Sequence, residues 1–342
     1  MSHNGVAIVI LNWNGRSFLQ KFLPLVILHS PKWVSIVVAD NGSTDDSVGL
    51  LKSQYPKVRI IELEKNQGYS GGYNMALQQV EAEYYVLLNS DLELTQNWLE
   101  PLIDYLENNK QTAAVQPKIL SWHEREYFEY AGASGGFIDL FGFPFCRGRI
   151  LNILEKDNGQ YDDSSEVLWA TGACLVVRSE AFWQGNGFDE RFFAHFEEID
   201  LCWRLKNMGY SVVAVPQSVV YHVGGGTLPN INPLKTFLNF RNSLWCITKN
   251  LPGRFYYPLL PIRLSMDVVA AFVFLFKGQT RDFLAVFKAH FAFFANFMKL
   301  RRESQGRPSK LTKGILRGSI VFCRFFGGKK VFSKLNIQKM GF

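Results

Sequence analysis

Several features that would assign a protein to a common class are missing from this sequence. The five cysteines form no CxxC pair and are odd in number, which argues against a zinc site of that kind and against a complete set of disulfides. The start of the chain has no basic segment and only a short apolar run, so we expect no secretory signal. We therefore expect reduced cysteines in a cytoplasmic chain.

Acidic residues are scarce in the last third of the chain. Residues 235–342 hold 20 Lys and Arg but only 3 Asp and Glu, whereas residues 1–234 hold 17 and 27. Of the 29 phenylalanines, 17 fall in the same last third. A basic, aromatic-rich segment behind an acidic body predicts two parts with different roles.

Apolar stretches alternate with helix signals through the first half of the chain. Four stretches have the sequences VAIVIL, SIVVA, VRII and YYVLL, at residues 6–11, 35–39, 58–61 and 84–88. Continuous apolar runs of this length are typical of strands that are covered on both faces. Strands that alternate with helices at this spacing predict an α/β fold, with a mostly parallel sheet between helices.

Polar and glycine residues follow each of the four predicted strands. They are Asn12 and Asn14, Asp40 and Asn41, Asn66 with Gly68, Gly71 and Gly72, and Asn89 with Asp91. Any one of these groups is ordinary turn composition. Four such groups at the carboxyl ends of parallel strands would meet at the edge where open α/β sheets bind ligands. The pattern predicts a polar crevice for a nucleotide, in which an Asp carboxylate suits a hard divalent cation.

A dinucleotide-binding dehydrogenase is the obvious rival for such a crevice. Its GxGxxG fingerprint should follow the first strand directly. Here NWNGRS follows the first strand, and the glycine-rich GYSGG follows the third strand with the wrong spacing. The sequence therefore argues against a dehydrogenase.

Six segments occur in the order and spacing of a known family. They have the sequences VAIVILNWNG, VVADNGSTDDS, NQGYSGGYNMAL, LLNSDLEL, WATGACLVVRSEAF and GFDERFFAHFEEIDLCWRLKNMGY. In these segments the chain resembles glycosyltransferase family 2, and most of all bacterial rhamnosyltransferases and related envelope-polysaccharide enzymes. The resemblance implies a Rossmann-like GT-A nucleotide-diphospho-sugar transferase fold over residues 1–245. A helical, basic, membrane-associating region over residues 246–342 would follow it.

The fourth strand ends on a variant of the family's metal motif. The family has Asp-x-Asp, whose last Asp binds Mg²⁺ or Mn²⁺ on the donor diphosphate. Here the motif is Asn89-Ser90-Asp91, which implies that Asp91 keeps the metal role and that Asn89 lies beside the donor. One negative charge is lost, so metal binding is expected to be weaker. Mg²⁺ commonly uses one or two carboxylates together with waters and phosphates, which suits a lone Asp91.

His222 ends a later apolar strand, in VVYHVGGGT. A lone His at a strand end is commonly structural, and that interpretation stays open. The resemblance implies instead that His222 completes the metal shell and that the loop Gly224–Gly226 closes over the diphosphate.

The resemblance also implies a set of donor contacts. A carboxylate at Asp40 would accept the N3–H of uracil or thymine, and Asn12 and Asp45 would line the base and ribose pocket. For Asp45, a helix-capping acid is the alternative. The wall beside the ribose and diphosphate would consist of Asn66, Gly68, Gly71 and Asn74.

Three acids fall within four positions in HFEEIDLCWRL, residues 195–205. They suit the first turn of a helix, but the preceding aromatic run would enclose them, and a desolvated carboxylate can act as a general base. The resemblance implies that Glu198 is the base, and that Glu197 and Asp200 hold the acceptor or the neighbouring helix.

The resemblance also places Trp169 and Gly172 in the acceptor and donor-sugar region, although a core role for Trp169 stays open.

The last third of the chain contains Phe283, Phe287, Phe291, Phe294 and Met298 on one predicted helical face. Packing against the catalytic part explains some of this face. The longest apolar run nearby, residues 268–276, is shorter than the ~20 residues of a membrane span. Phe-rich amphipathic helices flanked by KLRRESQGRPSKLTKG fit the surface of an anionic membrane. We expect peripheral attachment to the inner face of the cell membrane rather than spanning.

These expectations define an inverting glycosyltransferase. The donor would be a nucleotide sugar, with dTDP-rhamnose favoured and a UDP-sugar possible, and the acceptor a lipid-linked or polysaccharide glycan of the cell envelope. The alternative is a nucleotide-sensing protein with a nucleic-acid-binding basic tail. Interleaved phenylalanines favour lipid over nucleic acid, so we expect no nucleic-acid partner.

Overall fold

The computed structural model describes residues 5–224, 232–303, 311–329 and 331–335 of the 342-residue chain. Gly225 and Gly226 of the predicted diphosphate loop lie outside the described residues. Residues 304–310 of the basic segment after the predicted amphipathic helix lie outside them as well.

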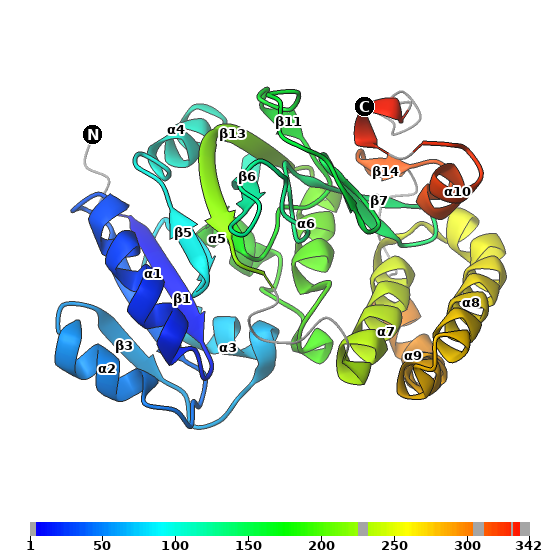
Figure 1. Ribbon diagram of the computed structural model, residues 1–342, viewed down its shortest axis with the longest axis horizontal. Helices are drawn as coiled ribbons and strands as arrows, with labels where there is room; N and C mark the ends of the chain where they lie inside the picture. Colours follow the sequence, from blue (N-terminus) through cyan, green and yellow to red (C-terminus); the bar gives the residue numbers. More distant parts are fainter. Residues whose placement is uncertain (1–4, 225–231, 304–310, 330, 336–342) are drawn as a thin grey trace.

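Four parallel strands form the first half of the main sheet, on the left of Figure 1. They are β1 (Val6–Asn12), β2 (Ser35–Asp40), β3 (Arg59–Glu62) and β4 (Tyr84–Asn89), in the order β3-β2-β1-β4. The helices between them are α1 (Arg16–His29), α2 (Ser47–Gln54) and α3 (Gly68–Leu77). The carboxyl ends of β1, β2 and β4 lie side by side, because Asn12 pairs with Asp40 and Leu11 with Asn89.

The second half of this sheet is mixed. β12 (Cys174–Arg178) runs antiparallel between β4 and β6 (Thr112–Ser121), and β13 (Ser211–His222) runs parallel to β6. The short strands β5 (Leu92–Leu94) and β11 (Ser165–Glu166) pair antiparallel with β13. Strands β1, β2, β3, β4, β6 and β13 therefore share one direction, which confirms the predicted mostly parallel sheet.

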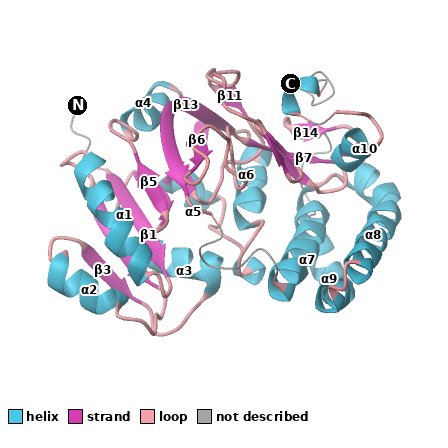
Figure 2. Ribbon diagram, in the orientation of Figure 1, coloured by secondary structure: helices cyan, strands magenta, loops and turns pink. Residues whose placement is uncertain are grey.

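Helices cover both faces of the sheet, as Figure 2 shows. Successive residues of β1 face opposite sides: Ile8 and Ile10 pack in one buried cluster, Ala7 and Val9 in the other. The first cluster takes in apolar residues of α1, α2 and α4 (Glu100–Asn108). The second takes in those of α3, α5 (Ser179–Gln184) and α6 (Glu197–Asn207). A 3₁₀ turn, η1 (Glu190–Phe192), precedes α6.

A smaller second sheet joins the middle of the chain to its C-terminal part. Its order is β10-β9-β8-β7-β14, with β10 at Ile153–Leu154, β9 at Arg149–Ile150, β8 at Pro144–Cys146, β7 at Gly136–Asp139 and β14 at Ile315–Leu316. The buried Asp139 carboxylate accepts backbone N–H groups from Phe141 and Phe143, both at 2.9 Å, and from Ile320 at 2.8 Å. Ile320 begins α10 (Ile320–Phe325), and η2 (Phe332–Lys334) follows.

The predicted boundary between residues 245 and 246 stays a prediction, and it falls within a helix. Helix α7 (Pro233–Asn250) runs through it and packs in one buried cluster with the catalytic part. Helices α8 (Gly253–Phe276) and α9 (Thr280–Glu303) follow, on the right of Figure 1. The C-terminal part is mainly helical as predicted, but β14 returns to the second sheet. Apolar residues on both sides of position 245 are buried in this cluster, so α7 packs as one unit across the predicted boundary.

Candidate active site

A hydrogen-bonded group of side chains lies at the carboxyl ends of β1 and β2. Nδ2 of Asn12 donates to Oδ1 of Asp40 at 3.0 Å, and the backbone N–H of Ser43 donates to Oδ2 of Asp40 at 2.9 Å. Asn12 and Asp40 are both buried, and Oδ1 of Asn12 has no hydrogen-bond partner within the described part of the chain. Buried acceptors are rarely left unsatisfied, so this oxygen suits a donor from a bound ligand.

Asp45 lies beside this group but is engaged with the backbone. Its Oδ2 accepts from the N–H of Arg16 at 3.0 Å, and its Oδ1 from the N–H of Ser47 at 3.1 Å. Burial alone would raise the pKa of Asp45, but these hydrogen bonds outweigh burial and lower it. The structure thus shows the capping arrangement that the sequence left open beside ligand contact.

The predicted wall of the diphosphate site is the loop that leads into α3. Oδ1 of Asn66 accepts from the N–H of Gly68 at 2.8 Å, which fixes the loop. Gly68 has a φ of +72°, and a Cβ there would lie 2.6 Å from the carbonyl oxygen of Phe193. Gly71 follows in the first turn of α3. Glycine at position 68 therefore allows the loop before α6 to lie directly against α3.

Asn74 of α3 holds the next segment of that loop. Its Nδ2 donates to the carbonyl of Phe188 at 2.8 Å and to Oε1 of Glu190 at 3.1 Å, and its Oδ1 accepts from the N–H of Phe188 at 3.0 Å. The side chain thus supports the loop that leads to the acidic residues. Its predicted contact with the donor stays a prediction.

The strand ends of β4 and β13 bring Asp91 and His222 together. Oδ1 of Asp91 lies 3.1 Å from Nε2 of His222, and both side chains are buried. Asn89, the last residue of β4, donates its backbone N–H to Ala173 at 2.9 Å. Burial alone would raise the pKa of Asp91, but His222 outweighs burial and lowers it.

The Asp91–His222 pair fits a shared divalent ion. Ligands at 2.0–2.1 Å on an octahedral ion lie about 3 Å from one another, which matches the 3.1 Å between Oδ1 and Nε2. Within the described ranges, no group of three or more His, Cys, Asp and Glu is arranged to hold a metal. The chain thus offers two ligands, and a donor diphosphate and waters would supply the others.

Glu129 is a site residue that the sequence analysis missed. It follows β6, and its Oε1 lies 3.4 Å from Nδ1 of His222. Burial by itself would lower the pKa of His222, but Asp91 and Glu129 together raise it to about 10. The segment around Glu129, YFEYAG, has no motif that would have revealed it.

The loop before α6 bends through unusual backbone conformations. Phe193, His195 and Phe196 have φ values of 65°, 68° and 72°. Positive φ is rare for bulky side chains and is found where function requires strain. The bend sets the first turn of α6 against the interior, as the aromatic run in the sequence predicted.

Glu197 and Glu198 lie in this first turn of α6. Oε2 of each has no hydrogen-bond partner among the residues that the structure describes. Burial raises the pKa of Glu198 to about 7. Burial, followed by the charge of Glu198, raises the pKa of Glu197 well above its usual range. A carboxyl group with a near-neutral pKa and an unpartnered oxygen can take a proton from a hydroxyl group.

Asp200, in contrast to Glu197 and Glu198, is surrounded by hydrogen-bond donors that favour its ionised form. Its carboxylate accepts from Nε of Arg204 at 2.7 Å, from Nζ of Lys249 at 2.9 Å and from Nδ2 of Asn250 at 2.8 Å. Burial would raise the pKa of Asp200, but Lys249 and Arg204 outweigh it and hold the pKa far below its usual range. Asp200 therefore ties α6 to α7, one of the two roles predicted for it.

Tyr69 connects the acidic pair with Gly172. Its hydroxyl donates to the carbonyl of Gly172 at 2.7 Å, and a Cβ on Gly172 would lie 2.6 Å from that hydroxyl. Burial, then Tyr73, then Glu197 and Glu198 raise the pKa of Tyr69. The predicted place of Gly172 in the acceptor and donor-sugar region stays a prediction. Tyr69 itself was not predicted, although it belongs to the NQGYSGG segment.

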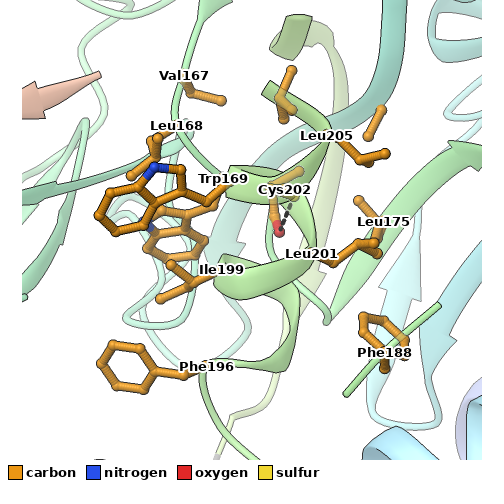
Figure 3. Close-up of a cluster of buried hydrophobic side chains, with 14 of the residues drawn as sticks. Val167, Leu168, Trp169, Leu175, Phe188, Phe196, Ile199, Leu201, Cys202 and Leu205 are labelled. Carbon is orange, nitrogen blue, oxygen red and sulfur yellow. Dashed lines mark hydrogen bonds between the residues drawn. The ribbon is translucent and has the colours of Figure 1, made fainter. Parts of the chain in front are cut away.

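Trp169 lies in the core instead of the crevice. Figure 3 shows its ring beside Leu168 and Ile199 in a cluster of buried side chains. It is only 3% exposed, and its Nε1 donates to the carbonyl of Phe137 at 2.9 Å. This position corresponds to the core role that the sequence left open, and it leaves no uncovered face for stacking on a sugar.

Several curated relatives are named as glycosyltransferases. The chain is 28% identical over 233 residues to N-acetylglucosaminyl-diphospho-decaprenol L-rhamnosyltransferase of Mycobacterium tuberculosis, which covers 63% of this chain and 75% of the relative. It is 27% identical over 230 residues to pre-mycofactocin glycosyltransferase of the same species, covering 65% of this chain and 43% of that one.

Solved structures with a similar fold carry nucleotides and Mn²⁺. GalNAc-T7 with UDP, GalNAc and Mn²⁺ superposes with a TM-score of 0.56 at 16% identity, over 72% of this chain and 48% of the other. The mannosyltransferase PcManGT from Pyrobaculum calidifontis, with GDP-Man and Mn²⁺, superposes with a TM-score of 0.53 at 13% identity, over 88% and 84%. Both likenesses show the fold, which is GT-A.

The sequence profile described as Glycosyl transferase family 2 matches residues 7–185, which contain β1 to β4 and the Asp91 motif. Together with the fold and the relatives, this match confirms the predicted enzyme class. The chain is a glycosyltransferase and belongs to glycosyltransferase family 2.

Proposed function

We propose that this enzyme transfers a sugar from a pyrimidine nucleoside-diphosphate donor to a lipid-linked or polysaccharide acceptor, in one inverting displacement. The observation that carries the proposal is the Glu197–Glu198 pair, in which Glu197 is buried, Glu198 is half-buried and Oε2 of each has no partner among the described residues. Cell-envelope synthesis is the setting that the rhamnosyltransferase relative supports. dTDP-rhamnose is the donor we favour, with a UDP-sugar as the second choice.

The bond changes follow from the positions of the side chains. The Glu198 carboxylate takes the proton of an acceptor hydroxyl as that oxygen forms a bond to the anomeric carbon of the donor sugar. The bond between this carbon and the diphosphate oxygen breaks, and its electron pair leaves with the nucleoside diphosphate. A divalent cation held by Asp91 and His222 would stabilise the negative charge on the leaving diphosphate. Asp40 and Asn12 would hold the base at the other end of the crevice.

A surface of the C-terminal part supports a location on the inner membrane face. Exposed apolar side chains cover α8, α9 and α10; they include Val269, Phe272, Val273, Phe276, Leu284, Phe287, Phe291, Phe294, Met298, Phe322, Phe325 and Phe326. We call these residues the apolar face. Phe276 and Phe291 are the most exposed of them on α8 and α9, at 87% and 79%. Exposed apolar side chains in this number suit a lipid or protein partner.

Charge favours an anionic lipid surface as that partner. The last third of the chain has only three acidic residues, and all three are engaged: Asp267 with Arg263 and His290, Asp282 with Thr236, and Glu303 with Arg191. This part of the chain therefore carries a large excess of Lys and Arg over acidic residues, and such an excess attracts anionic headgroups.

Helices α8 and α9 are each long and apolar enough to cross a membrane by length and composition. We propose that they lie on the surface instead. Arg263 of α8 is buried, pairs with Asp267 at 2.9 Å and donates to Oγ of Ser243 in α7 at 2.7 Å. Spanning would carry this ion pair into hydrocarbon and away from α7, which is costly.

The test of the function is release of nucleoside diphosphate from a panel of nucleotide sugars, with Mg²⁺, Mn²⁺ or EDTA and with membrane lipid extract as acceptor source. We expect metal-dependent release from one donor, lost in Asp91→Ala and in Glu198→Gln. Asp104→Asn, on the exposed side of α4, is the control and should keep full activity. Release by both site variants at the wild-type rate would overturn the proposal.

A further inference from the structure

Three segments that are distant in sequence converge on the ring of His222. Asp91 follows β4, Glu129 follows β6, and His222 ends β13. Nε2 lies 3.1 Å from Oδ1 of Asp91, and Nδ1 lies 3.4 Å from Oε1 of Glu129, which is an ion-pair distance. Nδ1 makes no hydrogen bond among the described residues, so its proton is free to be held by Glu129 when Nε2 binds a metal. All three residues are buried, with side-chain exposures of 9% for Asp91, 8% for Glu129 and 5% for His222. The imidazole is thus enclosed between two carboxylates, one at each nitrogen.

The two carboxylates are not equivalent with respect to a metal ion. A histidine that binds a metal through one nitrogen usually donates its other ring N–H to a carboxylate or carbonyl, which fixes the tautomer and the ring orientation. Nε2 faces Asp91, the proposed metal ligand, so Nδ1 is the nitrogen left for the outer partner. Glu129 occupies that outer position.

We infer that Glu129 is a positioning residue for the metal site: it holds His222 with the proton on Nδ1 and the lone pair of Nε2 directed at the metal. It also restores a negative charge close to the site, where Asn89 stands in place of the family's first carboxylate. This inference rests on the proposed metal-dependent transfer, because it assigns a role within that site.

Glu129 is itself held firmly enough for such a role. Its Oε2 accepts the backbone N–H of Ala131, and its own N–H donates to the carbonyl of Ile119 on β6 at 3.0 Å. On the other side lies Gly224, where a Cβ would come within 2.9 Å of Oε1. The hydrogen bond to Ala131 and the proximity of Gly224 thus hold the carboxylate beside Nδ1.

The first experiment measures Mn²⁺ binding by electron paramagnetic resonance, in the presence of dTDP and separately of UDP. We expect Glu129→Gln to weaken Mn²⁺ binding by about 10- to 100-fold, as is typical when the outer carboxylate of a metal-bound histidine is removed. The matched control is Glu93→Gln, which removes a carboxylate from β5 beside the Leu92–His222 pair. Glu93 bonds to Trp122 and Arg125 instead of His222, so its loss should change Mn²⁺ affinity less than about twofold.

A second measurement does not depend on the variant folding. Nitrogen-15 shifts of the wild-type histidines, with Mg²⁺ and nucleoside diphosphate present, report the tautomer, and His222→Gln assigns the signal. We expect His222 neutral with its proton on Nδ1. A proton on Nε2, or wild-type Mn²⁺ affinity in Glu129→Gln, would overturn the inference while leaving the proposed transfer intact. If the wild-type protein binds no Mn²⁺ with either diphosphate, the metal-dependent mechanism fails and the inference fails with it.

Discussion

Glu198 and Asp200 lie two residues apart in the first turn of α6, and their carboxyl groups are in opposite states. Arg204, Lys249 and Asn250 surround Asp200 and keep it ionised, whereas Glu198 has an unpartnered oxygen and a pKa raised by burial to about 7. Neighbouring carboxyl groups whose surroundings shift their pKa values in opposite directions commonly have different roles. We propose that Glu198 serves the chemistry, whereas Asp200 ties α6 to α7.

Exchanging each of these acids for its amide should separate the two roles. Glu198→Gln should lower sugar transfer by about 10²- to 10⁴-fold, the usual contribution of a general base, without loss of unfolding free energy. Asp200→Asn should lower the unfolding free energy by about 3–5 kcal/mol, because it leaves Lys249 and Arg204 buried without their anion. Product formation and denaturant unfolding of both variants provide the measurement. Equal activity in Glu198→Gln and wild type would remove Glu198 from the mechanism.

The pH dependence should reflect the raised pKa of Glu198. Only the ionised carboxyl group can accept a proton, so kcat/KM should rise with pH through a midpoint near 7.

The effect of the same carboxyl group on folding stability has the opposite dependence on pH. Because the folded pKa exceeds the ordinary value of 4.5, the protonated group favours folding, and this contribution is lost as pH rises from about 4.5 to about 7. Glu198→Gln should therefore become more stable relative to wild type across that interval. A flat stability difference would contradict the assignment.

Vesicle binding tests the apolar face. The wild-type protein should sediment with anionic phosphatidylglycerol vesicles and much less with neutral phosphatidylcholine vesicles. Replacing Phe276 and Phe291 together by Ser should weaken that binding roughly tenfold or more, because two phenyl groups no longer enter the lipid. Leu28→Ser on α1, at 71% exposure, is the matched control and should bind as wild type. The same loss in the control would mean that the apolar face is not the contact.

Gly68 offers a test of the loop that positions the acids. Gly68→Ala would place a methyl group 2.6 Å from the carbonyl oxygen of Phe193, so the loop before α6 must shift, and we expect both stability and transfer to fall. Gly209 has a φ of +98° but nothing within 4 Å of a Cβ. Gly209→Ala should therefore lower the unfolding free energy by only about 1 kcal/mol, the cost of the left-handed backbone conformation for alanine, and should keep its activity. If both variants behave alike, contact with Phe193 is not what position 68 provides.

The first half of the fold could be predicted because its signals are local. Each strand from β1 to β4 is a continuous apolar run that stops at polar residues, and parallel pairing then brings Asn12, Asp40 and Asn89 to one edge. The acidic pair could also be predicted, because the aromatic run before it in the sequence indicated that it would be removed from solvent. In these places the local pattern and the tertiary structure agree.

The rest depends on long-range contacts that leave no local pattern. Glu129 is a single carboxylate in an unremarkable segment, and only the pairing of β6 with β13 brings it to His222. Trp169 belongs to a segment of the family pattern, yet its burial depends on the second sheet, where it pairs with Gly136. The boundary at 245 followed the change in composition, whereas α7 packs its apolar side across that change.

The pairing of β14 with β7 has a consequence for how the protein is made. Ile315 must lie beside Ile138, and the N–H of Ile320 must reach the buried carboxylate of Asp139. During synthesis the nucleotide-binding strands can form early, but the second sheet stays incomplete until residues 315–320 have left the ribosome. Contacts between such distant positions form slowly. A ribosome that stalls before them would therefore hold a chain with a formed donor half and an open sheet edge, a species that chaperones and proteases would recognise.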